Sequence, residues 1–225
     1  MKYTLAFDVY GTLINTSGIL HALQKLIGRN AREFMDLWRN KQLEYSFRRS
    51  LMEAYVDFSI CTSQALEYCC LFHHIDLEQE QKEDLMRAYS VLPAYEDVKN
   101  ALRNLDELDY TQYAFSNGSA AAVTGLLENA GISDLFHGIV SVEATRVFKP
   151  NPLVYRYFNE QTNSKKEHSC LISGNPFDVM GAISYGMHAI WVQRSQDTIF
   201  DPWEFVPTKT IKQLGELPSV LKAIP

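Results

Sequence analysis

Two patterns of hydrophobic and polar residues alternate along this chain. Five short segments are apolar and rich in β-branched or aromatic residues without strict polar alternation, which is typical of strands buried on both faces of a parallel sheet. They are residues 3–7, 113–115, 139–142, 170–172 and 189–192. Helical spacing of apolar residues follows in residues 120–130, 152–161 and 178–185, and in the stretch after Pro93. Strands that alternate with single helices predict a doubly wound α/β core with a parallel sheet.

The interval between the first two predicted strands breaks this alternation. Its apolar residues recur at helical spacing throughout. Asn30, followed three residues later by Glu33, indicates a capping box at the start of one of its helices. We therefore expect an α/β core made of residues 1–14 and 95–225, with residues 15–94 inserted as an all-helical cap over the sheet.

Composition limits the partners that the chain can take. Of its 225 residues 46% are hydrophobic and 21% charged, a globular balance, and the net charge is −6. No Lys/Arg run offers the phosphate-neutralising surface that nucleic acid requires. The apolar runs are shorter than the roughly 20 residues that span a bilayer, and no signal-peptide pattern precedes the first strand. The four cysteines show neither a disulfide framework nor a C-x-x-C spacing. We expect a cytoplasmic protein with reduced thiols and without nucleic-acid or membrane partners.

Polar side chains follow the predicted strands at the edge where open α/β sheets bind ligands. They are Asp8 after the first strand, Ser116 and Asn117 after the second, Lys149 beyond the third, and Ser173 to Asp178 beyond the fourth. Each alone would more often be a helix cap or a solvated surface group. Together they supply a carboxylate nucleophile, a cation for an anionic substrate and a second carboxylate to activate water. The sequence therefore predicts a catalytic crevice at this edge.

These residues stand in segments that resemble the motifs of the haloacid dehalogenase superfamily. Residues 7–13 read FDVYGTL and resemble its first motif, and Ser116-Asn117-Gly118 resembles its second. Lys149-Pro150 is similar to its third motif, and Asp178 to its acidic fourth. Phosphotransferase members have a second Asp two residues after the nucleophile, where this chain has Tyr10. An aromatic ring replaces neither a proton-shuttling carboxylate nor a Mg²⁺ ligand, so Tyr10 argues against metal-assisted phosphoryl transfer.

The D-x-Y-G-T-L form resembles the L-2-haloacid dehalogenases in particular. In the insert, residues 38–45 and 49–52 are similar to that family's cap signature, and in the core residues 148–155 and 189–194 also match. The resemblance covers nearly the whole chain. It implies hydrolysis of a short L-2-haloalkanoic acid to the D-2-hydroxy acid and halide through a covalent ester. It also implies that the enzyme needs no cofactor or metal and forms a homodimer.

The same resemblance implies a role for each site residue. Asp8 would attack the carbon that bears the halogen, Lys149 would offset the negative charge, and Asp178 would direct water at the ester. Thr12, Ser173 and Asn175 would hold these groups by hydrogen bonds. Substrate would be bound at its carboxylate by Ser116 and main-chain N–H groups of Val9, Tyr10 and Gly11, at its halogen by Arg39, Asn117 and Phe177, and at its alkyl group by Leu43, Phe58 and Tyr10.

Two other functions stay open on the sequence alone. A phosphatase of the same superfamily, acting on a small phosphorylated metabolite, would require Mg²⁺. A binding protein on this scaffold would have no need for Asp8, Lys149 and Asp178 together. Phe177 stands where the family usually has Trp, which leaves the halogen preference and the shape of the pocket open.

Overall fold

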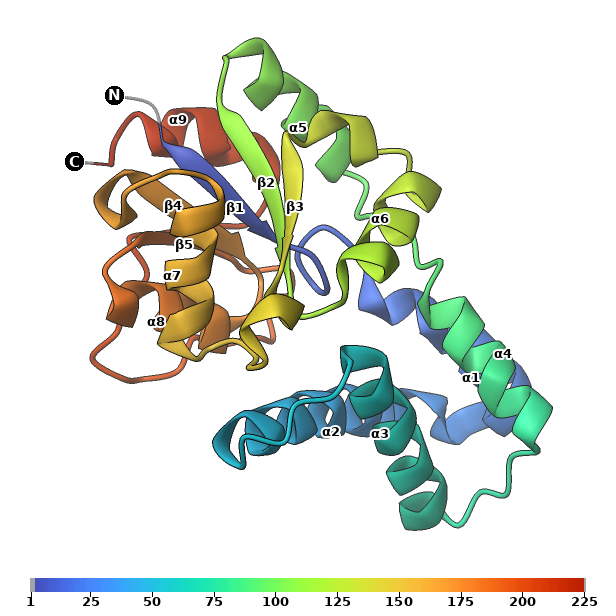
Figure 1. Ribbon diagram of the computed structural model, residues 1–225. Helices are drawn as coiled ribbons and strands as arrows, with labels where there is room; N and C mark the ends of the chain where they lie inside the picture. The colour runs from blue at the N-terminus through green and yellow to red at the C-terminus, as the bar shows by residue number, and fades with distance from the viewer. Residues whose placement is uncertain (1–2, 225) are drawn as a thin grey trace.

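A parallel sheet organises the larger part of the molecule (Figure 1). Within residues 3–224, which the computed structural model describes, six strands form one sheet in the order β3-β2-β1-β4-β5-β6. Every neighbouring pair is parallel. The strands are β1 (Thr4–Asp8), β2 (Thr111–Ser116), β3 (Gly138–Ser141), β4 (Ser169–Ser173), β5 (His188–Val192) and β6 (Lys209–Ile211). The first five confirm the predicted strands, and β6 is an additional edge strand.

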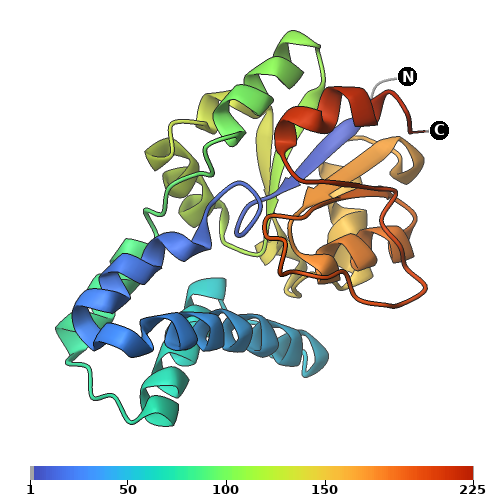
Figure 2. The same cartoon turned by 180° about the vertical axis from the view of Figure 1, so that it is seen from behind.

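Helices cover both faces of the sheet, because successive side chains of a strand point to opposite faces. Leu5 and Phe7 of β1 belong to one buried cluster, which also includes residues of α5, α6 and α9. Ala6 belongs to a second cluster with residues of α7 and α8. Figure 1 shows α7 and α8 in front of the sheet, and Figure 2 shows α5 and α9 on the opposite side. These helices are α5 (Val98–Glu107), α6 (Ala120–Asn129), α7 (Pro152–Gln161), α8 (Pro176–Tyr185) and α9 (Leu217–Leu221). The doubly wound α/β fold is thereby confirmed.

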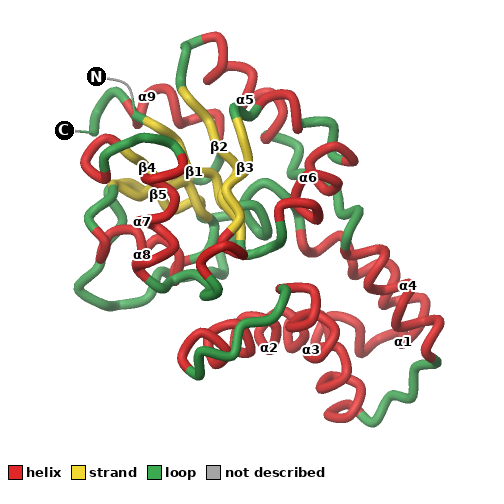
Figure 3. The backbone as a smooth tube through the Cα atoms, in the orientation of Figure 1, coloured by secondary structure: helices red, strands yellow, loops and turns green. Residues whose placement is uncertain are grey.

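The insert after β1 is helical and lies beside the carboxyl edge of the sheet (Figure 3). Trp38 anchors its centre, since the indole N–H donates to the Thr62 carbonyl at 2.8 Å. The helices are α1 (Leu20–Ile27), α2 (Ala31–Leu51), α3 (Phe58–His73) and α4 (Gln79–Tyr89). Short 3-10 helices span Thr16–Ile19 and Gly28–Asn30 in the insert, and Ser133–Leu135, Val142–Thr145, Lys166–His168 and Leu214–Glu216 in the core.

The chain enters and leaves the insert through two adjacent segments. Ile14 and Ala94 form an antiparallel bridge. The Asn15 N–H donates to the Pro93 carbonyl at 2.8 Å, and the Tyr95 N–H donates to the Leu13 carbonyl at 2.9 Å. These contacts, which we call the paired crossings, join the segment before α1 to the segment after α4.

The capping box expected at Asn30 is wrong. The Asn30 side chain makes no capping hydrogen bond, and its backbone is already helical, with φ −80° and ψ −5°. The reason is that the 3-10 helix Gly28–Asn30 continues directly into α2, whereas a capping residue needs an extended backbone. Asp57 has the side-chain cap instead, because its carboxylate accepts from the Ser59 N–H at the start of α3.

Two further expectations concern the cysteines and the membrane. Cys61, Cys69, Cys70 and Cys170 are all unpaired and buried, which confirms the expected thiols. Burial raises the pKa of the Cys69 thiol to about 12, so this group stays protonated at neutral pH. None of the helices within residues 3–224 combines the length and hydropathy of a membrane span.

Candidate active site

The carboxylate of Asp8 lies at the carboxyl end of β1 and is only 7% exposed. Its Oδ2 atom accepts hydrogen bonds from Thr12 Oγ1 at 2.7 Å, Asn175 Nδ2 at 2.7 Å and Ser173 Oγ at 3.2 Å. Its Oδ1 atom is bound by Lys149 Nζ at 3.1 Å. Three neutral donors therefore fix one oxygen, while the other carries the charge contact and is the better placed to attack an electrophile.

Lys149 is the cation between two carboxylates. Its side chain is 1% exposed, and Nζ lies 3.1 Å from Asp8 Oδ1 and 2.8 Å from Asp178 Oδ2. The third contact of the ammonium is the Phe115 carbonyl, at 2.8 Å. Three donors thus meet three acceptors, which makes the burial of this ammonium tolerable.

Asp178 lies in the first turn of α8 and is fully buried. Burial raises the pKa of its carboxyl to about 6; the negative charge of Asp8 adds to this effect, whereas Lys149 and the hydroxyl of Tyr155 oppose it. A carboxyl group with a pKa near neutrality can both accept and donate a proton, as a general base for water must do. The geometry also separates the two acids, since Asp8 accepts from two hydroxyls and an amide, whereas Asp178 accepts from the hydroxyl of Tyr155.

Ser116 is the last residue of β2, and Asn117 follows it. The Ser116 hydroxyl oxygen accepts from the Gly118 N–H at 3.1 Å. The Asn117 Oδ1 atom accepts from the Lys149 main-chain N–H at 2.9 Å, so the Nδ2 group of the same amide points away from that N–H. Asn117 is 7% exposed, so this N–H₂ group is a donor within a largely dry site.

One of the main-chain donors expected at the anion site has a partner within the loop after Asp8. Gly11 takes a positive φ of 80° to make the turn, and its N–H donates to the Ile14 carbonyl at 2.9 Å. That donor is used inside the turn, and the expected binding of substrate by the Gly11 N–H stays a prediction. The Val9 side chain is fully buried in the hydrophobic core, and this residue can reach a ligand only through its main chain.

Arg39 reaches the same space from α2 of the insert. Its Nη2 atom lies 3.4 Å from both the Tyr10 carbonyl and Asn175 Oδ1. The Nδ2 atom of the same Asn175 binds Asp8. One amide thus joins the guanidinium to the carboxylate, and these two sequence-predicted residues face a common site.

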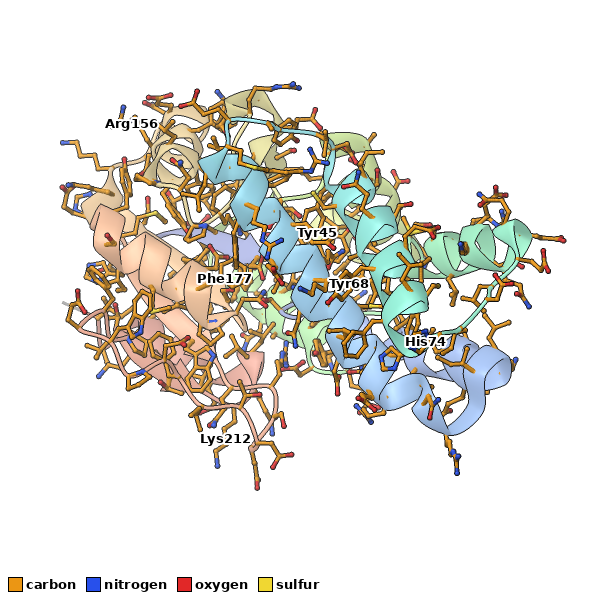
Figure 4. The ribbon with its side chains drawn as sticks, turned by 90° about the horizontal axis from the view of Figure 1, so that it is seen from below. Tyr45, Tyr68, His74, Arg156, Phe177 and Lys212 are labelled. Carbon is orange, nitrogen blue, oxygen red and sulfur yellow. The ribbon has the colours of Figure 1, made fainter. Side chains whose placement is uncertain are left out.

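Aromatic rings line the side of the site toward the insert. The Tyr10 ring lies 6.0 Å from the rings of both Phe58 and Tyr89. Burial raises the pKa of the Tyr10 hydroxyl, which therefore stays protonated. Phe177 of α8 meets Phe47 of α2 edge to face, with ring centroids 5.1 Å apart, and Figure 4 shows Phe177 beside α2.

Leu43 of α2 is half-buried and, within the described residues 3–224, packs against neither of the two hydrophobic clusters. It lies one turn beyond Arg39, close to the site. Its contact with the alkyl group of the substrate stays a prediction.

Two functional contacts have no counterpart in the sequence analysis. The Tyr155 hydroxyl donates to Asp178 Oδ1 at 2.8 Å. Gln42 is 1% exposed and orients Arg39, since its Oε1 accepts from Arg39 Nη1 at 2.6 Å and from the Tyr89 hydroxyl at 3.2 Å. Gln42 and Tyr155 both lie within segments that resemble the family, but neither residue type predicts which side chain it contacts.

Within the described residues 3–224, no three His, Cys, Asp or Glu side chains are placed to share a metal ion. Donors for an anionic substrate are present near the Asp8 carboxylate. Lys149 binds it directly, and Arg39 lies beside Asn175, which also binds it. The Asn117 amide accepts from the Lys149 main-chain N–H. Such an arrangement can bind a small anion and stabilise a second anion that departs from it.

Comparison with known proteins supports this chemistry. The family model of haloacid dehalogenase-like hydrolases matches residues 4–186. Haloacetate dehalogenase H-2 of Moraxella sp. (strain B) is 33% identical over 84% of this chain and 85% of its own length. The (S)-2-haloacid dehalogenase of Pseudomonas fluorescens is 32% identical over 94% of this chain and 92% of its own.

Solved structures lead in the same direction. The L-2-haloacid dehalogenase from Xanthobacter autotrophicus superimposes with a TM-score of 0.93 at 29% identity, over 100% of both chains. A structure of that enzyme with chloropropionic acid covalently bound also superimposes over 100% of both chains, with a TM-score of 0.93 at 28% identity.

Proposed function

We infer that this chain, which belongs to the haloacid dehalogenase-like hydrolase family, is an (S)-2-haloacid dehalogenase. It hydrolyses short L-2-haloalkanoic acids to D-2-hydroxy acids and halide. The observation that carries this inference is the Asp8 carboxylate, with Oδ2 fixed by three neutral donors and Oδ1 bound by Lys149. The covalent chloropropionic acid in a similar structure supports the ester route.

The first step is an in-line displacement at C2 of the substrate. Asp8 Oδ1 forms a bond to C2 while the carbon–halogen bond breaks, and the bonding electron pair leaves with the halide. Attack from the face opposite the halogen inverts the configuration and leaves an ester on Asp8. Arg39, the Asn117 amide and the edge of the Phe177 ring stabilise the departing halide, since donors placed where charge develops lower the barrier.

The second step is hydrolysis of the ester. Asp178 removes a proton from a water molecule, and the resulting hydroxide attacks the carboxyl carbon of Asp8. The bond between that carbon and Oδ1, the oxygen now attached to C2, breaks, and the proton returns from Asp178 to the leaving alkoxide. The product is the 2-hydroxy acid. The carboxyl group formed on Asp8 releases its proton to solvent, so both carboxylates regain their charge.

Binding of the substrate carboxylate falls to the end of β2 and the loop after β1. We assign this group to the Ser116 hydroxyl and to the main-chain N–H groups of Val9 and Tyr10. Thr12, Ser173 and Asn175 keep the nucleophile in a single orientation, as near-attack geometry demands. Tyr10 and Phe58 form the apolar wall for the substrate methyl group.

The test is to incubate the purified protein with each enantiomer of 2-chloropropionate, without added metal, and to measure chloride and the chirality of the lactate. Only the (S) enantiomer should release chloride, and the lactate should be (R). Release from neither enantiomer, together with Mg²⁺-dependent hydrolysis of a phosphate monoester, would favour a phosphatase instead.

The proposal extends to organisation and assembly. Residues 15–94 act as a cap on the core, and the paired crossings at Ile14 and Ala94 support this division. The resemblance to the family supports a homodimer, which sedimentation at several concentrations tests. The unpaired buried cysteines support a reducing compartment such as the cytoplasm, which fractionation of cells tests.

A further inference from the structure

An apolar groove opens to solvent beside the candidate active site. Its volume is about 550 Å³. Its walls come from α2 of the cap, from α8 and the loop before α7, and from the segment that follows β5 (Figure 4). The apolar side chains that define it are Phe47, Leu51, Phe177, Met180, Trp203 and Phe205.

The chemistry of the groove suits a hydrocarbon chain. Leu51 is 85% and Trp203 60% exposed, so this groove presents apolar surface to water. Lys149 is the one charged residue among those lining it within the described residues 3–224, and its ammonium binds Asp8 and Asp178. Burial of apolar area in this groove therefore stabilises a bound hydrocarbon chain, and the ammonium of Lys149 is already paired.

The groove shares two residues with the candidate active site. Lys149 and Phe177 belong both to its lining and to the candidate active site. The edge-to-face pair of Phe47 and Phe177 stands at this junction, with one ring from the cap and one from the core. An alkyl chain attached to a carbon beside Asp8 would have to pass this pair to enter the groove.

A second apolar space beside the site is smaller. It borders Tyr10 and Phe58 and has a volume of about 80 Å³, against about 550 Å³ for the groove. A methyl or ethyl group fits in the smaller space. A longer chain needs the larger one, because a packed protein interior yields little volume.

We propose that this groove is a second part of the substrate site and holds the alkyl chain of longer 2-haloalkanoic acids. The proposal rests on the proposed dehalogenase function and names a substrate class for it. Trp203 and Met180 then determine the accepted chain length, and the Phe47–Phe177 pair marks the entry from the reactive carbon to the groove.

The experiment compares bromide release from (S)-2-bromooctanoate and (S)-2-bromopropionate. The measured quantity is the ratio of kcat/KM for the long substrate to that for the short one. Trp203→Ala removes a wall, and Ser184→Trp fills the groove from an exposed position on α8. Each should lower the ratio by about tenfold, since a few methylene contacts discriminate on that scale.

Matched controls separate the groove from general effects of the substitutions. Ile199→Ala removes an exposed apolar side chain from the same loop, outside the groove lining, and Ala121→Trp adds an indole to exposed α6. Both should leave the ratio unchanged. Circular dichroism and sedimentation of every variant accompany the kinetics.

Each outcome has a distinct meaning. An unchanged ratio in both groove variants overturns the proposal, and an unchanged ratio with altered sedimentation assigns the groove to a second copy of the chain. If the unmodified protein releases no bromide from 2-bromopropionate, the dehalogenase function itself is contradicted. Turnover of the short substrate with a groove-dependent ratio supports both.

Discussion

On the core side of the active site, the Asp8 carboxylate is held by four side-chain donors at 2.7–3.2 Å. On the cap side, Arg39 approaches the Tyr10 carbonyl and Asn175 only at 3.4 Å. The core contacts join groups at the ends of neighbouring strands, which the sheet keeps in register. The cap contacts cross between two parts of the chain that meet through side chains.

This difference separates two tasks. The nucleophile and the base must keep a fixed geometry through both steps, and a short, buried network provides it. The leaving group must be stabilised and then released, which a longer and more adjustable contact permits. We therefore expect substitutions in the core network to affect turnover and stability together, and substitutions in the cap to affect turnover alone.

The largest effect is expected at the nucleophile. Asp8→Asn keeps the shape of the side chain but removes the attacking oxygen anion, and halide release should fall by about 10⁴-fold or more. Chloride assays on (S)-2-chloropropionate measure this loss. Asp134→Asn, an exposed acid on the core, is the matched control and should retain full activity. Undiminished turnover by Asp8→Asn would remove Asp8 from the mechanism.

Lys149→Met should impair both turnover and stability. The substitution leaves two buried carboxylates without their cation, which costs about 3–5 kcal/mol of unfolding free energy, and turnover should fall about 10³-fold. Lys149 lowers the pKa of Asp178, so its loss raises that pKa further and favours the neutral acid. The deficit should accordingly shrink from pH 8 to pH 5 in urea unfolding. Lys222→Met is the exposed control, and a deficit that does not vary with pH would contradict the account.

Arg39→Lys tests the cap side. The ammonium keeps the charge but loses the planar donor set that reaches Tyr10, Asn175 and Gln42, and kcat should fall about 10²-fold. The unfolding free energy should stay within about 0.5 kcal/mol of the original. Arg48→Lys is the control for kcat and stability alike, since Arg48 is exposed and pairs with half-buried Glu44 on the same helix. A stability loss as large as that of Lys149→Met would mean that the two sides do not differ.

The smallest effect is expected from Tyr155→Phe, and it depends on pH. The hydroxyl lowers the pKa of Asp178, which burial raises to about 6, so its removal raises that pKa. Because the base acts when ionised, ester hydrolysis should slow several-fold at pH 6 and little at pH 9. Rapid quenching with mass analysis of the ester on Asp8 measures the rate. Tyr185→Phe, whose ring stacks on Tyr155, should leave the pH profile in place.

The pattern of the chain predicted the first five strands, because each is a local apolar run bounded by turns. β6 was not predicted, because it has only three residues and two of them are exposed. Its pairing with β5 is what identifies it as a strand. The capping box at Asn30 failed for a related reason. The same side chain can cap a helix or continue a 3-10 turn, and the backbone that precedes it decides.

The sequence by itself determined that Asp8, Ser116, Lys149 and Asp178 converge, because parallel strands place their carboxyl ends on one edge of the sheet. Only the tertiary structure decided which atoms meet there. Tyr155 binds Asp178, which is 23 residues away in the sequence, and Arg39 contacts Asn175, which is 136 residues away. The Gly11 N–H is bonded within its own turn. The physical reason is that strand formation depends on neighbouring residues, whereas a buried hydrogen bond depends on which distant side chains exclude water together.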